Sequence, residues 1–175
     1  LHAPALQTLP EDVLKGPTAR LILSQELGTA SGIPGRVGGQ VHDMAGEHQA
    51  LSLSALTEMH ALKTGALIEF SAASAAIIAN NQRVEPLLRS FGTQLGLACQ
   101  VQDDIRDETS STETLGKQQG SDRAQAKSTF VSLLGLEAAQ NHLADLMKTA
   151  LNLLQQSQLA TDNLRALVHY MVERK

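Results

Sequence analysis

Three aspartates within five residues are the strongest chemical signal in the sequence. They stand in the stretch 100–107, which reads Gln-Val-Gln-Asp-Asp-Ile-Arg-Asp. Apolar residues at helical spacing precede it, so we expect a helix with one buried face. On such a helix Asp103 and Asp107 lie one turn apart on the same side, where like charges are unfavourable unless a cation lies between them. Carboxylate oxygens suit Mg²⁺, which in proteins keeps several waters and also binds phosphate oxygens.

A carboxamide stands close to these carboxylates. Gln100 lies one helical turn before both Asp103 and Asp104. The alternative interpretation is that the acidic residues form an ordinary solvated face near a helix end. Residues elsewhere in the chain must therefore decide between a metal site and a solvated face.

Three lysines are candidates for binding an anion beside such a metal. Lys63 stands in the middle of an otherwise apolar, small-residue segment and is followed by Thr64. Lys117 lies inside the polar segment 108–122, whose length suggests a function, and Lys127 follows it. Each lysine also has a plain alternative as a surface cation on an extended stem. Together with the carboxylates, these cations fit a diphosphate held through Mg²⁺.

Helices are expected to position these residues. Only 2% of the residues are aromatic, so the core must be built from Leu, Ala, Ile and Val, a composition that favours helices over strands. The fold class is therefore predicted to be all-α. We expect helices over 18–31, 54–79, 84–107, 128–134, 136–155 and 161–174, capped at their starts by residues that include Thr18, Ser54 and either Ser128 or Thr129.

Glycines mark places where these helices are expected to approach one another closely. The dipeptide Gly38–Gly39 is one such place, and Gly92 and Gly96, four residues apart, are another. Gln40 and Asp43 follow the first pair and share one face if that segment is helical. They are either the polar edge of a helix contact or part of a site.

Composition and charge argue against several functions. The 175 residues suffice for one domain with a core. The net charge of −4, from 14 Lys and Arg against 18 Asp and Glu, argues against nucleic acid as the main partner. No uninterrupted apolar run reaches the roughly 18 residues needed to cross a membrane, so we expect no membrane span. The start lacks a basic region followed by an apolar core, so we expect no signal peptide. Cys99 is the only cysteine, and a cytoplasmic location is the expectation.

Five segments in order resemble one enzyme family. The chain is similar to the trans-prenyltransferases, the polyprenyl (isoprenyl) diphosphate synthases, and among them to the bacterial farnesyl diphosphate synthase type. The matching segments are 38–43 (Gly-Gly-Gln with Asp43), 60–68 (His-Ala-Leu-Lys-Thr-Gly-Ala-Leu-Ile), 100–107, 114–117 (Thr-Leu-Gly-Lys) and 126–130 (Ala-Lys-Ser-Thr-Phe).

The resemblance covers nearly the whole chain but only the carboxy-terminal part of the family. It implies an all-α prenyltransferase (terpenoid-synthase) type of helical bundle, with residues 1–175 as the carboxy-terminal part of a single polyprenyl synthetase domain. Nothing in the chain matches the family's first Asp-rich motif or its amino-terminal helices. We therefore expect these 175 residues alone to be a poor catalyst or none.

The reaction implied by the resemblance is a head-to-tail condensation. An allylic diphosphate (dimethylallyl or geranyl diphosphate) ionises with the help of Mg²⁺, isopentenyl diphosphate attacks the cation, and a proton is lost. Farnesyl diphosphate is the expected product, with geranyl and geranylgeranyl diphosphate as alternatives. Family members usually form homodimers. The alternative function is a non-catalytic helical partner subunit, or an inactive fragment that binds diphosphate or dimerises. A terpene cyclase fits the Lys63–Gly65 and Lys117 segments less well.

The resemblance also assigns roles to single residues. Asp103 would bind magnesium directly, and Asp104 and Asp107 would complete the second Asp-rich motif. The cations that would hold the allylic diphosphate are Lys63, Lys117 and Lys127. Thr64 and Gln100 would face the carbocation with their oxygens. Gln40 would belong to a polar network beside the cavity.

Overall fold

The protein is described by a computed structural model that covers residues 16–47, 49–109 and 127–173. These residues form helices and no strand, which confirms the all-α prediction. The helices are α2 (Pro17–Ser31), α3 (Arg36–Ala45), α4 (Leu53–His60), the π-helical turn η1 (Ala61–Gly65), α5 (Ala66–Ile78), α6 (Glu85–Thr109), α9 (Phe130–Leu134), α10 (Leu136–Ser157) and α11 (Asp162–Glu173).

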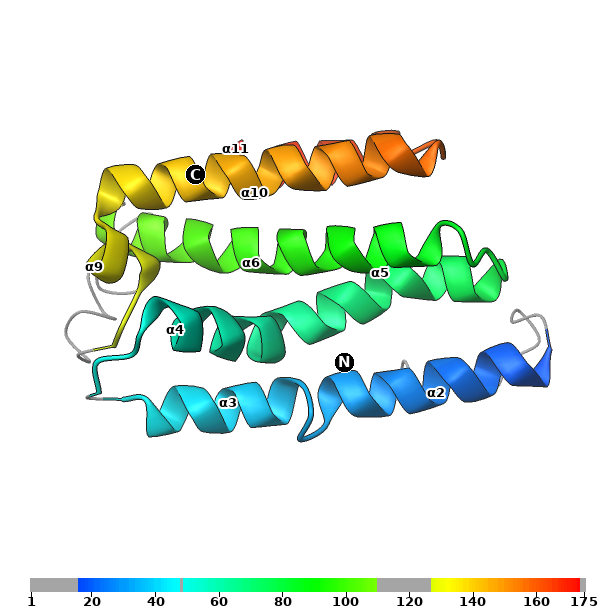
Figure 1. Ribbon diagram of the computed structural model, residues 1–175, viewed down its shortest axis with the longest axis horizontal. Helices are drawn as coiled ribbons and strands as arrows, with labels where there is room; N and C mark the ends of the chain where they lie inside the picture. Colours follow the sequence, from blue (N-terminus) through cyan, green and yellow to red (C-terminus); the bar gives the residue numbers. More distant parts are fainter. Residues whose placement is uncertain (1–15, 48, 110–126, 174–175) are drawn as a thin grey trace.

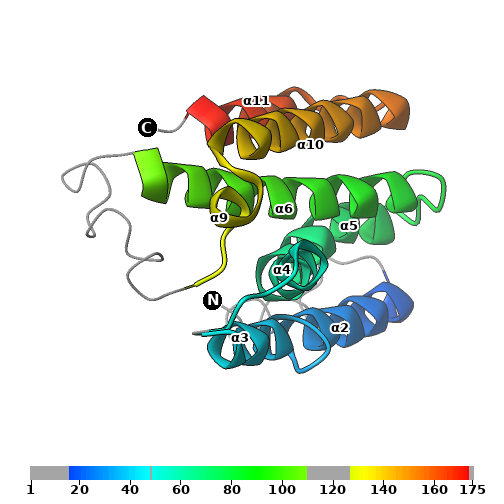
Figure 2. The same cartoon turned by 60° about the vertical axis from the view of Figure 1, so that its left-hand side comes forward.

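The helices are stacked in layers around α6. Helix α6 packs against α10 on one side and against α4, η1 and α5 on the other (Figures 1 and 2). Helices α2 and α3 lie outside α5 and η1, and α11 packs beside α10. The long helix with the aspartates therefore lies in the interior of the bundle, and its last turns reach the end at which α3, α4 and α9 meet.

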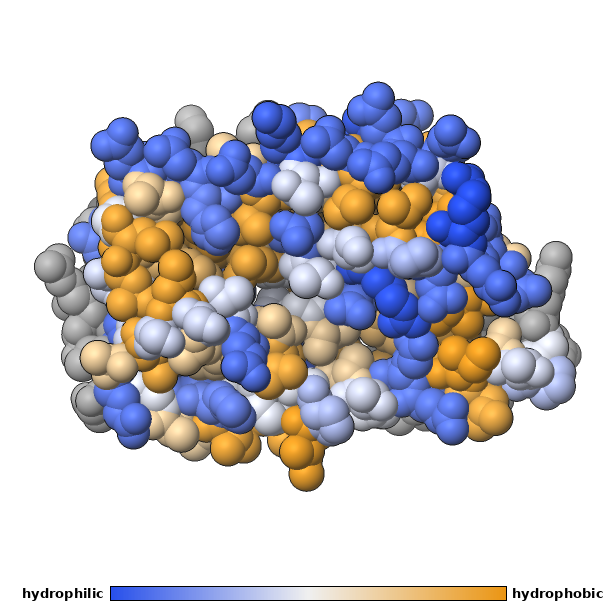
Figure 3. All heavy atoms as spheres, viewed as in Figure 1, coloured by the Kyte–Doolittle hydropathy of each residue, from blue (hydrophilic) through white to orange (hydrophobic). Residues whose placement is uncertain are grey.

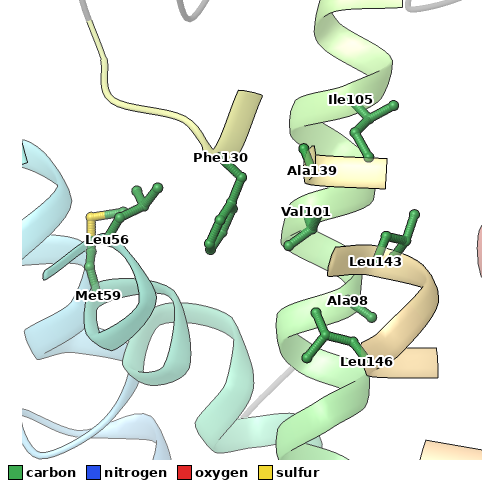
Figure 4. Close-up of a cluster of buried hydrophobic side chains, with 9 residues drawn as sticks. All are labelled: Leu56, Met59, Ala98, Val101, Ile105, Phe130, Ala139, Leu143 and Leu146. Atoms are coloured by element: carbon green, nitrogen blue, oxygen red, sulfur yellow. The ribbon is translucent and has the colours of Figure 1, made fainter. Parts of the chain in front are cut away.

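Helix α6 is central because apolar residues recur on it every three or four positions. Leu88, Phe91, Leu95, Ala98 and Val101 are all buried, as the helical spacing predicts. The amino-terminal half of this stripe packs on α5, α10 and α11. The carboxy-terminal half joins a second cluster, drawn in Figure 4, made of Leu56, Met59, Ala98, Val101, Ile105, Phe130, Ala139, Leu143 and Leu146.

Phe130 closes this second cluster at the start of α9. Its side chain is 0% exposed and points between the α4 residues Leu56 and Met59 and the α6 residue Val101 (Figure 4). Thr129 caps α9: it accepts a hydrogen bond from Ser132 N, and the Ser132 hydroxyl receives one from Thr129 N. One of the two caps predicted for this helix is thereby confirmed.

Two other predicted caps are wrong by two residues each. Helix α4 begins at Leu53 because Ser52 has extended backbone angles and accepts a hydrogen bond from Ala55 N at 3.2 Å, so Ser54 lies inside the helix. Helix α2 begins at Pro17, whose fixed φ suits the first helical position, and Thr18 does not cap it.

The turn η1 interrupts what the sequence predicts as one uninterrupted helix over 54–79. A π-helical turn is wider than an α-helical one and holds one more residue. Glycines on both neighbouring helices allow this wide turn to be approached closely. A Cβ at Gly39 of α3 would lie 2.2 Å from the backbone nitrogen of Lys63, and a Cβ at Gly96 of α6 would lie 2.7 Å from the Cα of Gly65.

The expected close contacts at Gly39, Gly92 and Gly96 are therefore confirmed. Gly92, one turn before Gly96, allows α6 to approach α5 in the same way, because a Cβ there would lie 2.5 Å from the Cα of Glu69. Three glycines thus set the spacing of α6 against α5 and η1 and of α3 against η1, and α3, η1 and α6 carry most of the predicted site residues.

The continuous helical stretch Leu53–Ile78 is long and apolar enough to cross a membrane, by length and composition alone. A core helix of a soluble protein meets the same criterion. Lys63 lies in the middle of this stretch and is ion-paired with Asp43 of α3. The stretch packs against α2, α3 and α6, so we interpret it as a helix of the bundle, and the expected lack of a membrane span stays a prediction.

The surface mixes polar and apolar side chains. Figure 3 shows charged and polar groups over much of one face, with apolar areas between them that include the lower edge, where α2 and α3 run. Exposed apolar residues of these two helices and the turn between them are Leu21, Ile22, Ile33, Val37, Val41 and Met44.

Candidate functional site

Two of the predicted anion-binding lysines are brought together on one aspartate. Lys63 Nζ lies 2.7 Å from Asp43 Oδ2, and Lys127 Nζ lies 3.5 Å from the same oxygen. Lys63 comes from the π-helical turn, Asp43 from the last turns of α3, and Lys127 from the segment before α9. The close fit of Gly39 against Lys63 N sets the distance between the first two elements.

The electrostatics keep this cluster charged. Burial works to raise the pKa of Asp43, but its hydrogen bond with Lys63 and the charges of both lysines outweigh burial and lower it below 3.8. Burial works to lower the pKa of Lys127, but Asp43 and Glu47 outweigh it and raise the pKa. Glu47 contributes through an ion pair of 3.3 Å with Lys127. The cluster therefore pairs two lysines with two carboxylates, and the shifts of Asp43 and Lys127 both favour the charged forms.

A serine fixes the segment that carries Lys127. Ser128 Oγ accepts a hydrogen bond from Leu51 N at 3.0 Å and donates one to Gln49 O at 3.3 Å. This ties residues 127–129 to the turn between α3 and α4. Lys127 is thus held from two sides, by its ion pairs and by its neighbour in the chain.

A cavity of about 310 Å³ lies beside this cluster. Asp104 and Asp107 of α6 line it together with Lys127 and Thr129. Asp107 is 4% exposed, and Asp104 Oδ2 accepts a hydrogen bond of 2.7 Å from Phe130 N, which fixes one of its oxygens. Lys127 therefore lies between the Asp43 ion pairs and the carboxylates of the Asp-rich stretch.

The donor set of this cavity fits Mg²⁺ bound together with a phosphate. Within 16–47, 49–109 and 127–173, no three His, Cys, Asp or Glu side chains gather so that they could hold a metal ion by themselves. Mg²⁺ needs no such cage, because one or two carboxylates with waters and phosphate oxygens complete its octahedral shell. Asp104 and Asp107 supply two carboxylates at one cavity, and Asp103 lies exposed on the same helix end. The magnesium-binding role of these three residues stays a prediction.

His60 is a residue that the sequence interpretation did not assign to the site. It is 8% exposed, and its ring stacks on Phe130 with centroids 5.7 Å apart. Burial is the main cause that lowers its pKa to about 4, and the charge of Lys63 adds to the effect. Its position three residues before Lys63, beside the buried Met59, is the signal that could have pointed to it.

The other predicted residues lie in different surroundings. Thr64 is half-buried in the π-helical turn beside Lys63. Gln100 is half-buried on α6. Gln40 is exposed on α3, although Asp43 on the same helix belongs to the lysine cluster. Lys117 lies outside the described residues.

This arrangement can bind a small, highly charged anion. Two lysines act as point charges, carboxylates at the neighbouring cavity can share a divalent cation with the anion, and backbone close contacts hold the elements together. The surrounding faces of α5 and α6 are rich in Ala, Leu and Ile and are suited to apolar material.

Comparison with known proteins identifies relatives among the prenyl diphosphate synthases. The family model for polyprenyl synthetase matches residues 30–171. The farnesyl diphosphate synthase of Micrococcus luteus is 45% identical over 156 residues, which are 89% of this chain and 54% of that protein. The farnesyl diphosphate synthase of Escherichia coli is 40% identical over 186 residues, which are 99% of this chain and 62% of that protein.

A solved structure shares the fold. The geranyltransferase of Helicobacter pylori, complexed with magnesium and isoprenyl diphosphate, superposes with a TM-score of 0.79 at 31% identity and covers 98% of this chain and 56% of that one. The chain thus spans between half and two thirds of the length of these relatives. The family match over most of its residues shows that this chain belongs to the polyprenyl synthetase family.

Proposed function

We propose that the site of Lys63, Lys127 and the Asp-rich stretch binds the diphosphate of an allylic substrate with Mg²⁺, for head-to-tail condensation with isopentenyl diphosphate. The observation that carries the proposal is the convergence of both lysines on Asp43, next to the cavity of Asp104 and Asp107. The resemblance to farnesyl diphosphate synthases supports the same reaction class. The complex of the geranyltransferase with magnesium and isoprenyl diphosphate agrees with it.

The chain's own residues would act mainly on the leaving group. Lys63 and Lys127 neutralise the diphosphate oxygens, so the negative charge that develops as the allylic C–O bond breaks is stabilised. Asp104 and Asp107, with Asp103, would hold Mg²⁺, which supplies further charge neutralisation of the departing diphosphate when bound. Asp43 would keep the two ammonium groups in place until the diphosphate enters.

The carbocation left behind needs oxygen dipoles in a dry surrounding. We assign this role to Thr64, in the π-helical turn, and to Gln100, which lies on the facing helix α6. Lys117 would be the third cation of the diphosphate site, and Gln40 would belong to its polar rim. Farnesyl diphosphate is the proposed product, made from dimethylallyl or geranyl diphosphate in the cytoplasm.

Binding of inorganic pyrophosphate by the chain tests the anion site directly. Isothermal titration in the presence of Mg²⁺ should give a saturable signal that chelation of the metal abolishes. Lys63→Ala and Lys127→Ala should each weaken binding about ten- to a hundred-fold, the effect of losing one charge-assisted hydrogen bond. Lys148→Ala, on the exposed face of α10, is the matched control and should leave the affinity unchanged.

Two results would contradict this function. The unmodified chain could fail to bind pyrophosphate with Mg²⁺, or the three lysine variants could weaken binding equally. Product analysis with an allylic diphosphate and isopentenyl diphosphate then separates the two functional alternatives. Binding with condensation supports the synthase, whereas binding without condensation supports a non-catalytic partner subunit or fragment.

We further propose that the chain pairs with a second copy through α3 and the turn before it. Val37, Val41 and Met44 lie at helical spacing on one face, each close to half or more exposed, and Ile33 precedes them at 78% exposure. Analytical ultracentrifugation should show a dimer. The Val37→Asp/Val41→Asp double variant should dissociate it, and Asn152→Asp on α10 should not. A monomeric unmodified chain at micromolar concentration rules this interface out.

A further inference from the structure

A hydrogen bond ties the start of α9 to the Asp-rich stretch. Phe130 is the first residue of α9, and the N–H groups in the first turn of a helix have no acceptor inside that helix. The Phe130 N–H donates instead to Asp104 Oδ2, from a residue 26 positions earlier, at 2.7 Å. Because Phe130 is 0% exposed, water does not take the place of this acceptor, and an unpaired N–H there would be unfavourable.

The residues just before Phe130 are attached to a different element. Ser128 Oγ accepts a hydrogen bond from Leu51 N at 3.0 Å and donates one to Gln49 O at 3.3 Å, so Ser128 is attached to the turn between α3 and α4. Lys127 is the neighbour of Ser128 in the chain. The short segment that carries this lysine is therefore held at Ser128 by the turn and at Phe130 by α6.

The two attachments are too close in sequence to move independently. Thr129 is the residue between them, and it forms the cap of α9: its hydroxyl accepts from Ser132 N, and its own N–H donates to the Ser132 hydroxyl. A shift of Phe130 would therefore be passed through Thr129 to Ser128 and to the lysine before it.

We propose that Asp104 is a positioning residue, whose Oδ2 holds the start of α9 and so fixes Lys127 relative to the carboxylates of α6. Asp104, Asp107 and Lys127 line the same cavity of about 310 Å³, so a shift of the segment would change the distance between the ammonium group and these carboxylates. The bond to Phe130 N gives Asp104 a task in addition to the metal binding proposed above. The consequence for diphosphate binding rests on the proposed function.

Two substitutions of Asp104 separate positioning from charge. Asp104→Asn keeps an oxygen that can accept from Phe130 N, whereas Asp104→Ala has no acceptor. Both variants lose the negative charge, so a role limited to charge or to metal binding predicts the same result for both. A difference between the two variants therefore isolates the positioning role.

Amide hydrogen exchange, measured by NMR spectroscopy on the 175-residue chain without metal or anion, tests this role. In Asp104→Ala the Phe130 N–H should exchange at least about ten-fold faster relative to the Leu133 N–H, which donates to Thr129 O within α9. The Leu51 N–H should also exchange faster, because its acceptor is Ser128 Oγ and the segment that carries Ser128 is loosened. In Asp104→Asn both amides should exchange as in the unmodified chain.

Asp103→Ala is the matched control, because Asp103 lies exposed beside Asp104 on α6 and its removal should leave both amides unchanged. Faster exchange at Phe130 without a change at Leu51 would mean that Ser128 holds the segment without help, which overturns the proposal. Equal exchange in the two Asp104 variants overturns it as well.

A measurement on the unmodified chain still decides if Asp104→Ala does not fold. A scalar coupling across the hydrogen bond, between the Phe130 backbone ¹⁵N and the carboxylate carbon of Asp104, should be present. Its presence supports the attachment of α9 to α6 in solution. Its absence overturns the proposal.

Titration of the same samples with Mg²⁺ and inorganic pyrophosphate separates this proposal from the proposed function. Lys127→Ala should weaken binding less in the Asp104→Ala chain than in the Asp104→Asn chain, because a displaced lysine contributes less. Absence of binding in the unmodified chain, with the expected exchange pattern, refutes the anion site but supports the positioning role. Binding with equal exchange in both Asp104 variants refutes the positioning role and leaves the anion site supported.

Discussion

Replacing Gly39 by alanine tests whether the contact between α3 and the π-helical turn positions the lysine cluster. An added Cβ would lie 2.2 Å from the nitrogen, 2.5 Å from the Cα and 2.8 Å from the Cβ of Lys63. Two of these atoms belong to the backbone, so no side-chain rotation relieves the contact and α3 must move outward. Asp43, one turn further along α3, then moves away from Lys63.

The expected change in the free energy of unfolding is the sum of two opposing contributions. Alanine is favoured over glycine inside a helix by about 1 kcal/mol, whereas overpacking a close contact costs about 1–3 kcal/mol or more. With backbone atoms in contact the upper end applies, and we expect a net loss of about 2 kcal/mol in the free energy of unfolding. For a domain of this size, that loss lowers the melting temperature by about 4–8 °C.

The control for this prediction is Gly28→Ala on α2. A Cβ there meets nothing within 4 Å, so the same substitution should raise the stability by up to about 1 kcal/mol. Chemical denaturation monitored by circular dichroism measures both variants. Pyrophosphate binding should weaken at least about ten-fold in Gly39→Ala only, because one charged contact of the site is displaced. A Gly39→Ala chain as stable as Gly28→Ala would refute the reasoning.

Three further predictions address stability. Arg89→Met should lower the free energy of unfolding by about 1 kcal/mol at low salt and by less at high salt. The reason is that Arg89 forms ion pairs with Glu26 of α2 at 2.6 Å and with Glu85 at 2.8 Å. A loss of stability that does not depend on salt in denaturant titrations would contradict this. Phe130→Ala should cost about 3–5 kcal/mol in the same assay, since it empties a fully buried position, and a cost below about 1 kcal/mol would show that α9 is not part of the core. The pKa of His60 is about 4 in the folded chain against 6.5 in the unfolded one, so the unfolded chain binds the extra proton between these values. Stability should therefore fall as the pH falls from 6.5 towards 4, by on the order of 3 kcal/mol more than in His60→Phe, and equal pH profiles of the two chains would contradict the buried neutral ring.

The helices were predictable because their signal is local and periodic. The buried stripe of α6 and the glycines at close contacts follow from residue type and spacing alone. Cap positions were less accurate, because neighbouring hydroxyl residues such as Ser52 and Ser54 compete and tertiary packing selects between them. The π-helical turn was not predicted, and in the structure the backbones of α3 and α6 approach it closely.

The site was predictable in its residue types but not in its pairings. Lys63 and Lys127 stand out in the sequence, yet their common partner Asp43 lies 20 residues from the first and much further from the second. Only the fold brings these three together. His60 was missed for the opposite reason: a histidine beside apolar residues on a helix resembles an ordinary core residue, and its ring partner Phe130 comes from a distant segment.

The π-helical turn has a consequence for how this helix tolerates changes in length. Each residue of an α-helix turns the chain by about 100°, so an insertion or deletion normally rotates everything on one side of it. The turn Ala61–Gly65 already holds one residue more than an α-helical turn. Because this extra residue is held inside the turn, removing one residue there would restore an ordinary helix and leave Leu56 and Met59 on the face that packs around Phe130. A helix with a π-helical turn can therefore accommodate a single-residue insertion without losing its regular structure. A one-residue gap within such a helix in a sequence alignment then corresponds to the presence or absence of this turn.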